Sequence, residues 1–135
     1  MSADDVSREV THGSQALTAA RALIDLKLFN DALTRTYYAA FHYACALLLT
    51  EGVEPRRHRS LPGLIAAHLA GAGFDASDAA RLGRLSTYRD MADYERAFDA
   101  TEELAKEALA DAEAFIRKAS DCLRDRGAVS KPPTS

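Results

Sequence analysis

The segment from Asn30 to Thr50 reads NDALTRTYYAAFHYACALLLT and is apolar over most of its length. Its apolar side chains recur at spacings of three and four residues, which places them on one stripe of a helix with 3.6 residues per turn. These residues are Leu33, Tyr37, Ala40, Phe41, Ala44 and Leu48. A helix that is apolar nearly all round must be covered by other elements. The segment is therefore predicted to be the central helix of a bundle.

A second face of this helix carries polar groups among apolar ones. Arg35, Tyr38 and His42 follow one another at spacings of three and four residues. A guanidinium, a phenol and an imidazole that converge can bind a phosphate, or position one for cleavage. The alternative, which the burial habits of these residues favour, is that Tyr38 and His42 belong to the core and satisfy their polar atoms there.

The rest of the chain also shows helical spacing, and no segment alternates apolar and polar residues as a strand would. The expected helices run from Asp4 or Asp5 to Lys27, from Ser60 to Leu69, from Asp75 or Ser77 to Ala92, and from Asp99 to Gly127. Asn30 is expected to cap the central helix, and Asp99 with Glu102 to cap the last one. The predicted class is an all-α, up-and-down bundle of four or five helices, formed by one domain over residues 1–126 with a disordered tail over residues 127–135.

Length and composition limit the function classes. The 135 residues, 47% of them hydrophobic, suffice for one buried core. The net charge of -3 gives no general attraction to nucleic acid or to an anionic membrane, so any contact with RNA must be local. The longest apolar run is too short to span a bilayer, the N-terminus has no signal-peptide pattern, and neither cysteine has a metal-ligand spacing. We therefore expect a cytoplasmic protein without membrane contact, metal or cofactor.

Arg89 is the charged residue that is hardest to explain as a solvent-exposed surface group. It follows Leu82 by seven residues and Leu85 by four, so it lies on the inward face of its helix. A charge there is costly unless it is paired, and Asp93 is four residues further on, within reach of an intrahelical ion pair. A structural ion pair and a functional site both remain open. Aromatic residues close by in sequence suit either stacking against a base or ordinary packing: Tyr88, Tyr94 and Phe98.

The loop after the central helix contains the most concentrated basic cluster, Arg56-Arg57-His58-Arg59. Such a cluster can contact phosphates, although runs of like charge are more often simply solvated. The chain contains no Gly-x-Gly-x-x-Gly, P-loop, His-Glu-x-x-His or Gly-x-Ser-x-Gly motif. The sequence therefore contains none of these catalytic motifs that would identify an activity without further evidence.

The block ALTRTYYAAFHYACALL at residues 32–48, followed by His58 and by RDMADY at residues 89–94, resembles the HEPN domain family. The resemblance covers nearly the whole chain. It implies a small prokaryotic all-α domain that forms a homodimer and is often made beside a minimal nucleotidyltransferase, the two acting as toxin and antitoxin. In the ribonuclease members, an arginine and a histidine four to six residues apart act in a cleft at the dimer interface.

Carried onto this chain, the resemblance matches Arg89 to the arginine, but Tyr94 stands where the histidine is expected. A phenol, whose ordinary pKa is about 10, is a poorer general base at neutral pH than an imidazole. The missing histidine therefore favours a homodimeric module that binds nucleotide or RNA and has a nucleotidyltransferase partner. Its expected binding residues are Arg35, Tyr38, His42, His58 and Asp93, beside Arg89 and Tyr94.

Two alternatives remain open. The first is a metal-independent endoribonuclease toxin, in which Arg89 holds the phosphate and Tyr94 or a histidine from elsewhere, His42 or His58, transfers the proton. The second is a purely structural bundle.

Overall fold

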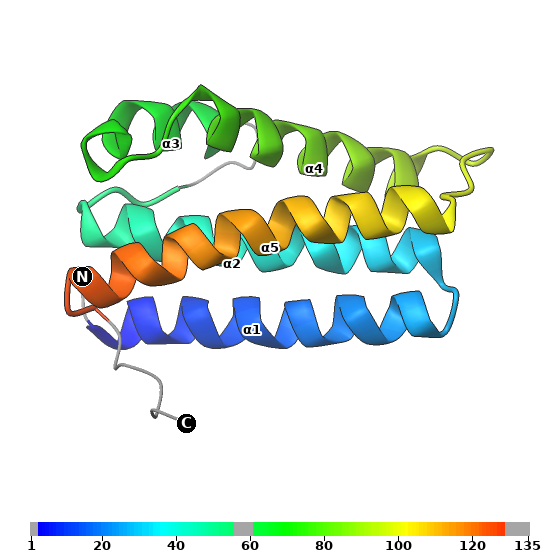
Figure 1. Cartoon of the computed structure of the whole chain (residues 1–135), viewed down its shortest axis with the longest axis horizontal. Helices are drawn as coiled ribbons and strands as arrows, with labels where there is room; N and C mark the ends of the chain where they lie inside the picture. Colours follow the sequence, from blue (N-terminus) through cyan, green and yellow to red (C-terminus); the bar gives the residue numbers. More distant parts are fainter. Residues whose placement is uncertain (1–2, 56–60, 129–135) are drawn as a thin grey trace.

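The computed structural model describes residues 3–55 and 61–128, and all regular structure in these two ranges is helical. The elements are α1 (Ala3–Asp25), α2 (Phe29–Thr50), α3 (Leu61–His68), the single-turn 3-10 helix η2 (Ala70–Ala72), α4 (Ala76–Tyr94) and α5 (Glu102–Asp125) (Figure 1). The long helices run up and down beside one another, so the prediction of an all-α, up-and-down bundle is confirmed. The division into a domain over residues 1–126 and a tail stays a prediction.

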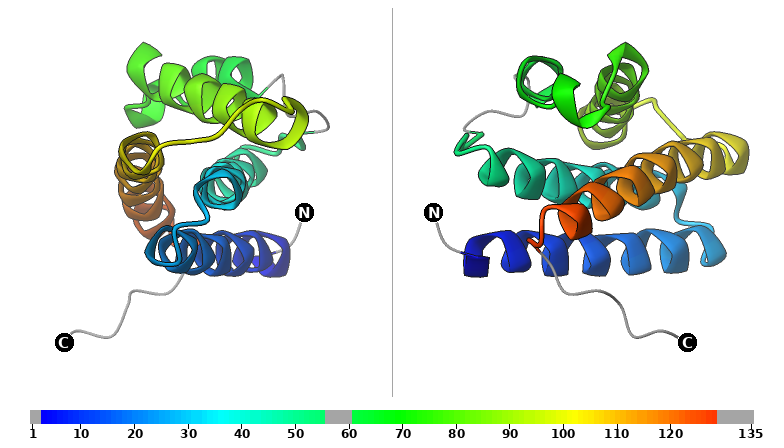
Figure 2. Two further views of the ribbon diagram at one scale, coloured as in Figure 1. Left: turned by 90° about the vertical axis from the view of Figure 1, so that its right-hand side faces the viewer. Right: turned by 60° about the vertical axis from the view of Figure 1, so that its left-hand side comes forward.

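α2 is the central helix, as its composition predicted. It packs against α1, α4 and α5, and its predicted apolar stripe is buried except for Phe41, which is half-buried. The left-hand view of Figure 2 shows these three helices around α2, with no described helix over its remaining side, between α1 and α4. We call this the open side of α2. The polar face predicted for α2 lies there, because Tyr38 meets Arg89 on α4 and His42 meets Glu9 on α1. Arg35 on this face is exposed, and Phe41 and Leu49 next to it are half-buried.

The predicted cap of α2 is wrong. α2 begins one residue before Asn30, and Leu28 holds the N-cap position without a side-chain hydrogen bond. Asn30 serves a long-range contact instead: its amide nitrogen donates to the carbonyl of Phe98 (3.0 Å), and its Oδ1 accepts from the backbone N–H of Ala100 (2.8 Å). Asn30 therefore fastens the connection between α4 and α5 to the start of α2.

The predicted cap of α5 is also wrong. Thr101, not Asp99, is the N-cap, and its hydroxyl accepts from the backbone N–H of Leu104 at 3.1 Å. Threonine is also a preferred N-cap residue, although it ranks somewhat below aspartate, and the fold uses it here in place of Asp99.

The N-cap of α4 is Asp75, one of the two starts that the sequence left open. The Asp75 carboxylate accepts from the backbone N–H groups of Ser77 (3.0 Å) and Asp78 (3.2 Å), while Asp78 Oδ2 accepts from the N–H of Asp75 (2.9 Å). The pKa of Asp75 is lowered from 3.8 to about 2, chiefly because the Ser77 hydroxyl donates to the carboxylate at 2.7 Å. The ionised form is the one that caps the helix.

We expect the contribution of Asp75 to stability to disappear between about pH 4 and about pH 2. The folded-state pKa lies below the unfolded one, so the carboxylate stabilises the fold above its unfolded pKa and loses this effect as the pH falls through its folded pKa. Asp75→Asn keeps an acceptor at the cap but cannot ionise. Urea unfolding of both proteins at a series of pH values should show their difference in unfolding free energy shrinking over that window. A difference that is constant across it contradicts the assignment.

α1 and α2 approach closely at Gly13. A Cβ atom at this position would lie 2.7 Å from Cδ2 of Tyr43 and 3.2 Å from the carbonyl oxygen of Ala39. Gly13→Ala should therefore destabilise the protein by about 1 kcal/mol, because overpacking outweighs the gain in helix propensity. Gly83→Ala is the matched control, since a Cβ there meets nothing within 4 Å, and it should stabilise by up to about 1 kcal/mol. Urea unfolding measures both, and equal effects would show that the two helices do not meet at Gly13.

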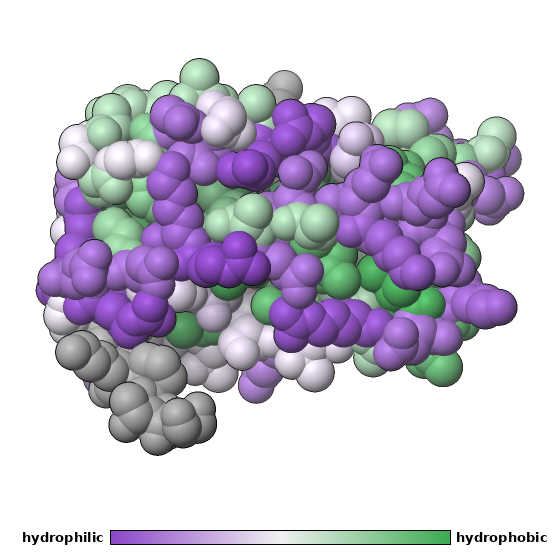
Figure 3. Space-filling view, viewed as in Figure 1, coloured by the Kyte–Doolittle hydropathy of each residue, from purple (hydrophilic) through white to green (hydrophobic). Residues whose placement is uncertain are grey.

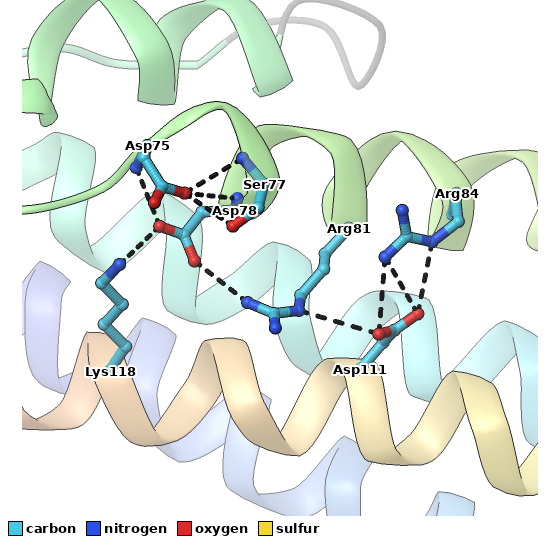
Figure 4. A network of polar contacts seen from close by, with 7 residues as sticks. All are labelled: Asp75, Ser77, Asp78, Arg81, Arg84, Asp111 and Lys118. Carbon is cyan, nitrogen blue, oxygen red and sulfur yellow. Dashed lines mark hydrogen bonds and ion pairs between the residues drawn. The ribbon is translucent and has the colours of Figure 1, made fainter.

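A network of charged side chains joins α4 to α5 (Figure 4). Its centre is Asp78, which is 1% exposed and lies 2.6 Å from Lys118 Nζ and 3.3 Å from Arg81 Nη1. Asp111 on α5 continues the network through Arg81 (3.7 Å) and Arg84 (3.4 Å). The face that α5 presents is correspondingly mostly hydrophilic (Figure 3). This face is charged, whereas the open side of α2 also exposes apolar and aromatic side chains such as Phe41 and Leu49.

Candidate functional site

Arg89 faces inward from α4 toward α2, as its spacing predicted, and its side chain is 14% exposed. Nη1 donates to Oη of Tyr38 at 3.4 Å and lies 3.8 Å from Oδ2 of Asp93, which is the predicted intrahelical pair. Nη2 lies 3.2 Å from Oδ1 of Asp90. Nε is buried and has no hydrogen-bond partner among the described residues. The guanidinium is therefore held in place, but the described residues do not satisfy all of its donors.

Three tyrosine rings surround the same guanidinium. Its carbon lies 5.3 Å from the ring centre of Tyr37 and 5.8 Å from the ring centres of Tyr38 and Tyr94. These are cation–π distances. Burial raises the pKa of Tyr37 to about 12, so this phenol stays protonated and cannot serve as a base near neutral pH.

Asp93 and Tyr94 end α4 beside this cluster. Asp93 Oδ1 accepts from Thr34 Oγ1 at 2.5 Å, so Asp93 fastens the end of α4 to α2 while its other oxygen faces Arg89. Tyr94 is 72% exposed, and its ring is the part of the cluster most open to solvent. Tyr94 is therefore free to meet a ligand or another chain.

Tyr38 connects the two predicted groups of residues. Its ring centre lies 5.0 Å from the guanidinium carbon of Arg35, which is exposed, and its hydroxyl meets Arg89. The sequence placed Arg35 and Arg89 in separate helices, and the structure brings both to one aromatic ring. The open side of α2 thus carries two cations around Tyr38.

His42 is paired with a residue that the sequence did not single out. Its Nδ1 lies 2.8 Å from Oε2 of Glu9 on α1, and the ring of His12 stands edge-on at 5.4 Å between centroids. We assign the proton of this contact to Nδ1, because carboxylate oxygens accept hydrogen bonds, and Nε2 is then the remaining ring nitrogen. Glu9 precedes His42 by 33 positions, so no spacing within one helix could reveal the pair. The sequence indicated only that Glu9 and His12 share one face of α1, since they lie three residues apart.

The remaining predictions concern His58, metal binding and membrane contact. His58 and the rest of the basic run lie outside the described residues. Within residues 3–55 and 61–128, no group of three or more His, Cys, Asp or Glu side chains is arranged to hold a metal ion. None of the helices described in these ranges combines the length and apolarity that crossing a membrane requires.

Comparison with known proteins extends over most of the chain. The family model of the HEPN domain matches residues 8–122. The chain is 30% identical over 123 residues to the protein named "Putative toxin MJ0605" of Methanocaldococcus jannaschii, covering 90% of this chain and 91% of that protein. It is 28% identical over 120 residues to a UPF0332 protein of Archaeoglobus fulgidus, covering 89% of this chain and 96% of the relative.

Proposed function

Because this chain belongs to the HEPN domain family, we propose that it is the HEPN component of a toxin–antitoxin type module and that it acts as a homodimer binding RNA or a nucleotide. The observation that supports this most directly is the guanidinium of Arg89, which is 14% exposed among three tyrosine rings at the edge of the open side of α2. The toxin name of the first relative supports the biological setting.

The chemistry of this cluster suits a nucleotide. A guanidinium offers a planar fork of donors that matches phosphate oxygens, and an aromatic ring stacks on any base. Arg89 and Arg35 supply the forks, and Tyr38 and the exposed Tyr94 supply rings. With a net charge of -3 the protein does not attract RNA as a whole, so binding depends on this local group. Asp93 and His42 complete the proposed binding residues.

A second copy of the chain is the proposed cover for the open side of α2. Phe41 and Leu49 are half-buried there and line a small pocket of about 160 Å³ together with Cys45, Pro55 and two glutamates, Glu9 and Glu54. An apolar helix face is stable when another element covers it, and a two-fold axis lets the same face cover itself. Such a dimer would bring two copies of the Arg89 cluster near one seam.

The partner proposed from the family resemblance is a nucleotidyltransferase. Its support is the family membership together with the toxin name of the relative. A tagged copy expressed in its native host should co-purify with this partner. Recovery of the chain without any nucleotidyltransferase, under conditions that preserve other complexes, would remove the partner from the proposal.

Binding is tested by titrating the protein into a fluorescent RNA oligonucleotide and, separately, into a fluorescent ATP analogue. We expect saturable binding of at least one probe and, by light scattering, the mass of a dimer. A monomeric protein that binds neither probe would overturn the proposal and leave a structural bundle.

The Glu9–His42 pair favours one second candidate, a metal-independent endoribonuclease. A carboxylate that holds Nδ1–H leaves Nε2 as a proton acceptor, which is the arrangement of a general base. An RNA cleavage assay in the presence of EDTA tests it. If wild-type protein cuts RNA, His42→Gln should slow cleavage by roughly 10² to 10⁴-fold, whereas His68→Gln on α3 should not. Intact RNA with wild-type protein rejects this candidate and leaves the binding proposal in place.

A further inference from the structure

A pocket of about 330 Å³ lies between α1 and α2, next to Arg35. Its lining residues are His12, Gln15, Ala16, Ala19, Arg35 and His42. The two alanines leave room, because their side chains end at Cβ. The polar residues come from two rigid helices, so the backbone fixes the positions from which they reach the pocket.

The polar lining consists of hydrogen-bond donors suited to an anion. Arg35 is permanently charged and carries five N–H donors, Gln15 has an amide NH₂, and His12 and His42 each have ring nitrogens that can donate. None of the described residues that line this pocket is acidic. Phosphate oxygens are the acceptors that such a set of donors recognises best.

Glu9 lies beside the pocket rather than in its lining. Its carboxylate is engaged by Nδ1 of His42 at 2.8 Å, which fixes the ring and leaves Nε2 for a ligand. Nε2 donates to a phosphate oxygen in the imidazolium form of His42, in which both ring nitrogens carry a proton. Glu9 lines a different pocket, together with Glu54 and Cys45. Glu9 and Glu54 therefore belong to the lining of that pocket and not to the lining of the pocket beside Arg35.

We propose that this pocket binds a phosphate group, with Arg35, His12 and His42 as binding residues and Glu9 as the residue that positions His42. The proposal rests on the proposed function for the source of the phosphate, which is an RNA strand or a free nucleotide. Tyr38 separates the pocket from Arg89, since its ring meets Arg35 and its hydroxyl meets Arg89. An RNA strand would therefore place one phosphate on each side of Tyr38.

The direct test is a titration of the full chain with inorganic phosphate, followed by long-range ¹H–¹⁵N NMR of the imidazole signals. We expect the signals of His12 and His42 to shift together and to saturate with one dissociation constant. His68 on α3 is an internal control, because it is exposed and does not line the pocket, so its signal should not move. Absence of any shift at His12 and His42, or an equal shift at His68, overturns the proposal.

Charge substitutions in the pocket supply matched controls. Arg35→Gln should weaken phosphate binding about tenfold, whereas Arg21→Gln, an exposed arginine paired with Glu113, should leave it unchanged. Ala19→Glu should weaken binding by about tenfold or more, while the neutral Ala19→Gln should not. Equal losses within either pair would mean that the effect is not electrostatic and would overturn the assignment.

Two further arms identify the source of the phosphate. ADP and a short single-stranded RNA are each titrated while the His12 and His42 signals are followed, in wild type and in Arg89→Gln. Shifts with ADP alone indicate a nucleotide site, and shifts with RNA that weaken in Arg89→Gln indicate a strand that crosses Tyr38. A different result would show that the proposed function is wrong while the pocket is right: neither ADP nor RNA binds, although inorganic phosphate still shifts the NMR signals of His12 and His42. If ADP or RNA binds without moving them, only the pocket is rejected.

Discussion

Arg89→Gln is expected to lower the affinity for RNA or nucleotide by roughly ten- to a hundredfold while leaving the protein folded. Loss of a hydrogen bond to a charged group accounts for this range. The fold should tolerate the change because the groups left behind have other partners or reach solvent: Asp90 is exposed, and Asp93 keeps its hydrogen bond from Thr34. Fluorescence titration measures the affinity, and circular dichroism checks the helix content.

Two further variants show which property of Arg89 the affinity depends on. One tests the planar geometry of the guanidinium against its charge, and the other tests whether loss of any arginine on α4 has the same effect. Arg89→Lys keeps a cation but loses the planar fork, so its affinity should fall between those of wild type and Arg89→Gln. Arg84→Gln removes an arginine from the same helix that pairs with Asp111 on α5, and it should bind as wild type does. If Arg84→Gln and Arg89→Gln lose equal affinity, binding depends on overall charge, and the site around Tyr38 is not the one used.

The position of Arg89 could be predicted because it depends on one helix only. Helical period fixes which residues share a face with Leu82 and Leu85, and both of these are buried as expected. The same logic identified the core stripe of α2. It also ordered Arg35, Tyr38 and His42 on one face of α2, although it could not show that α1 and α4 leave that face open.

What could not be predicted depends on contacts between distant segments. Asn30 has the right chemistry for a cap, but the backbone of the α4–α5 connection, 68 to 70 positions away, takes its amide instead. Glu9 gave no signal because its partner lies in another helix. Residues with several hydrogen-bonding options are assigned by the tertiary fold, and sequence spacing alone does not rank those options.

Asp78 is the clearest residue whose partners are assigned by the tertiary fold. Asp78→Ala should destabilise the protein by about 2 to 3 kcal/mol. The carboxylate is 1% exposed and accepts from the backbone of Asp75 as well as from Lys118 and Arg81. Loss of the capping box alone costs about 1 kcal/mol. Breaking a fully buried ion pair costs about 3 to 5 kcal/mol, but the Lys118 and Arg81 side chains are 37% and 31% exposed and can turn to water, so the loss here should be smaller.

Urea unfolding of Asp78→Ala measures this loss, and Asp121→Ala is its control. Asp121 is 58% exposed and pairs with Arg124 within α5, so its removal should change stability by less than about 0.5 kcal/mol. Asp78 lies eleven residues before Arg89 on α4, on the side that faces α5, so Asp78→Ala should bind RNA or nucleotide normally while it remains folded. The two substitutions on α4 should therefore have opposite signatures: Asp78→Ala loses stability and keeps affinity, whereas Arg89→Gln keeps stability and loses affinity. If both lose both, the Arg89 cluster acts only as part of the packing of α4, and its role in binding is rejected.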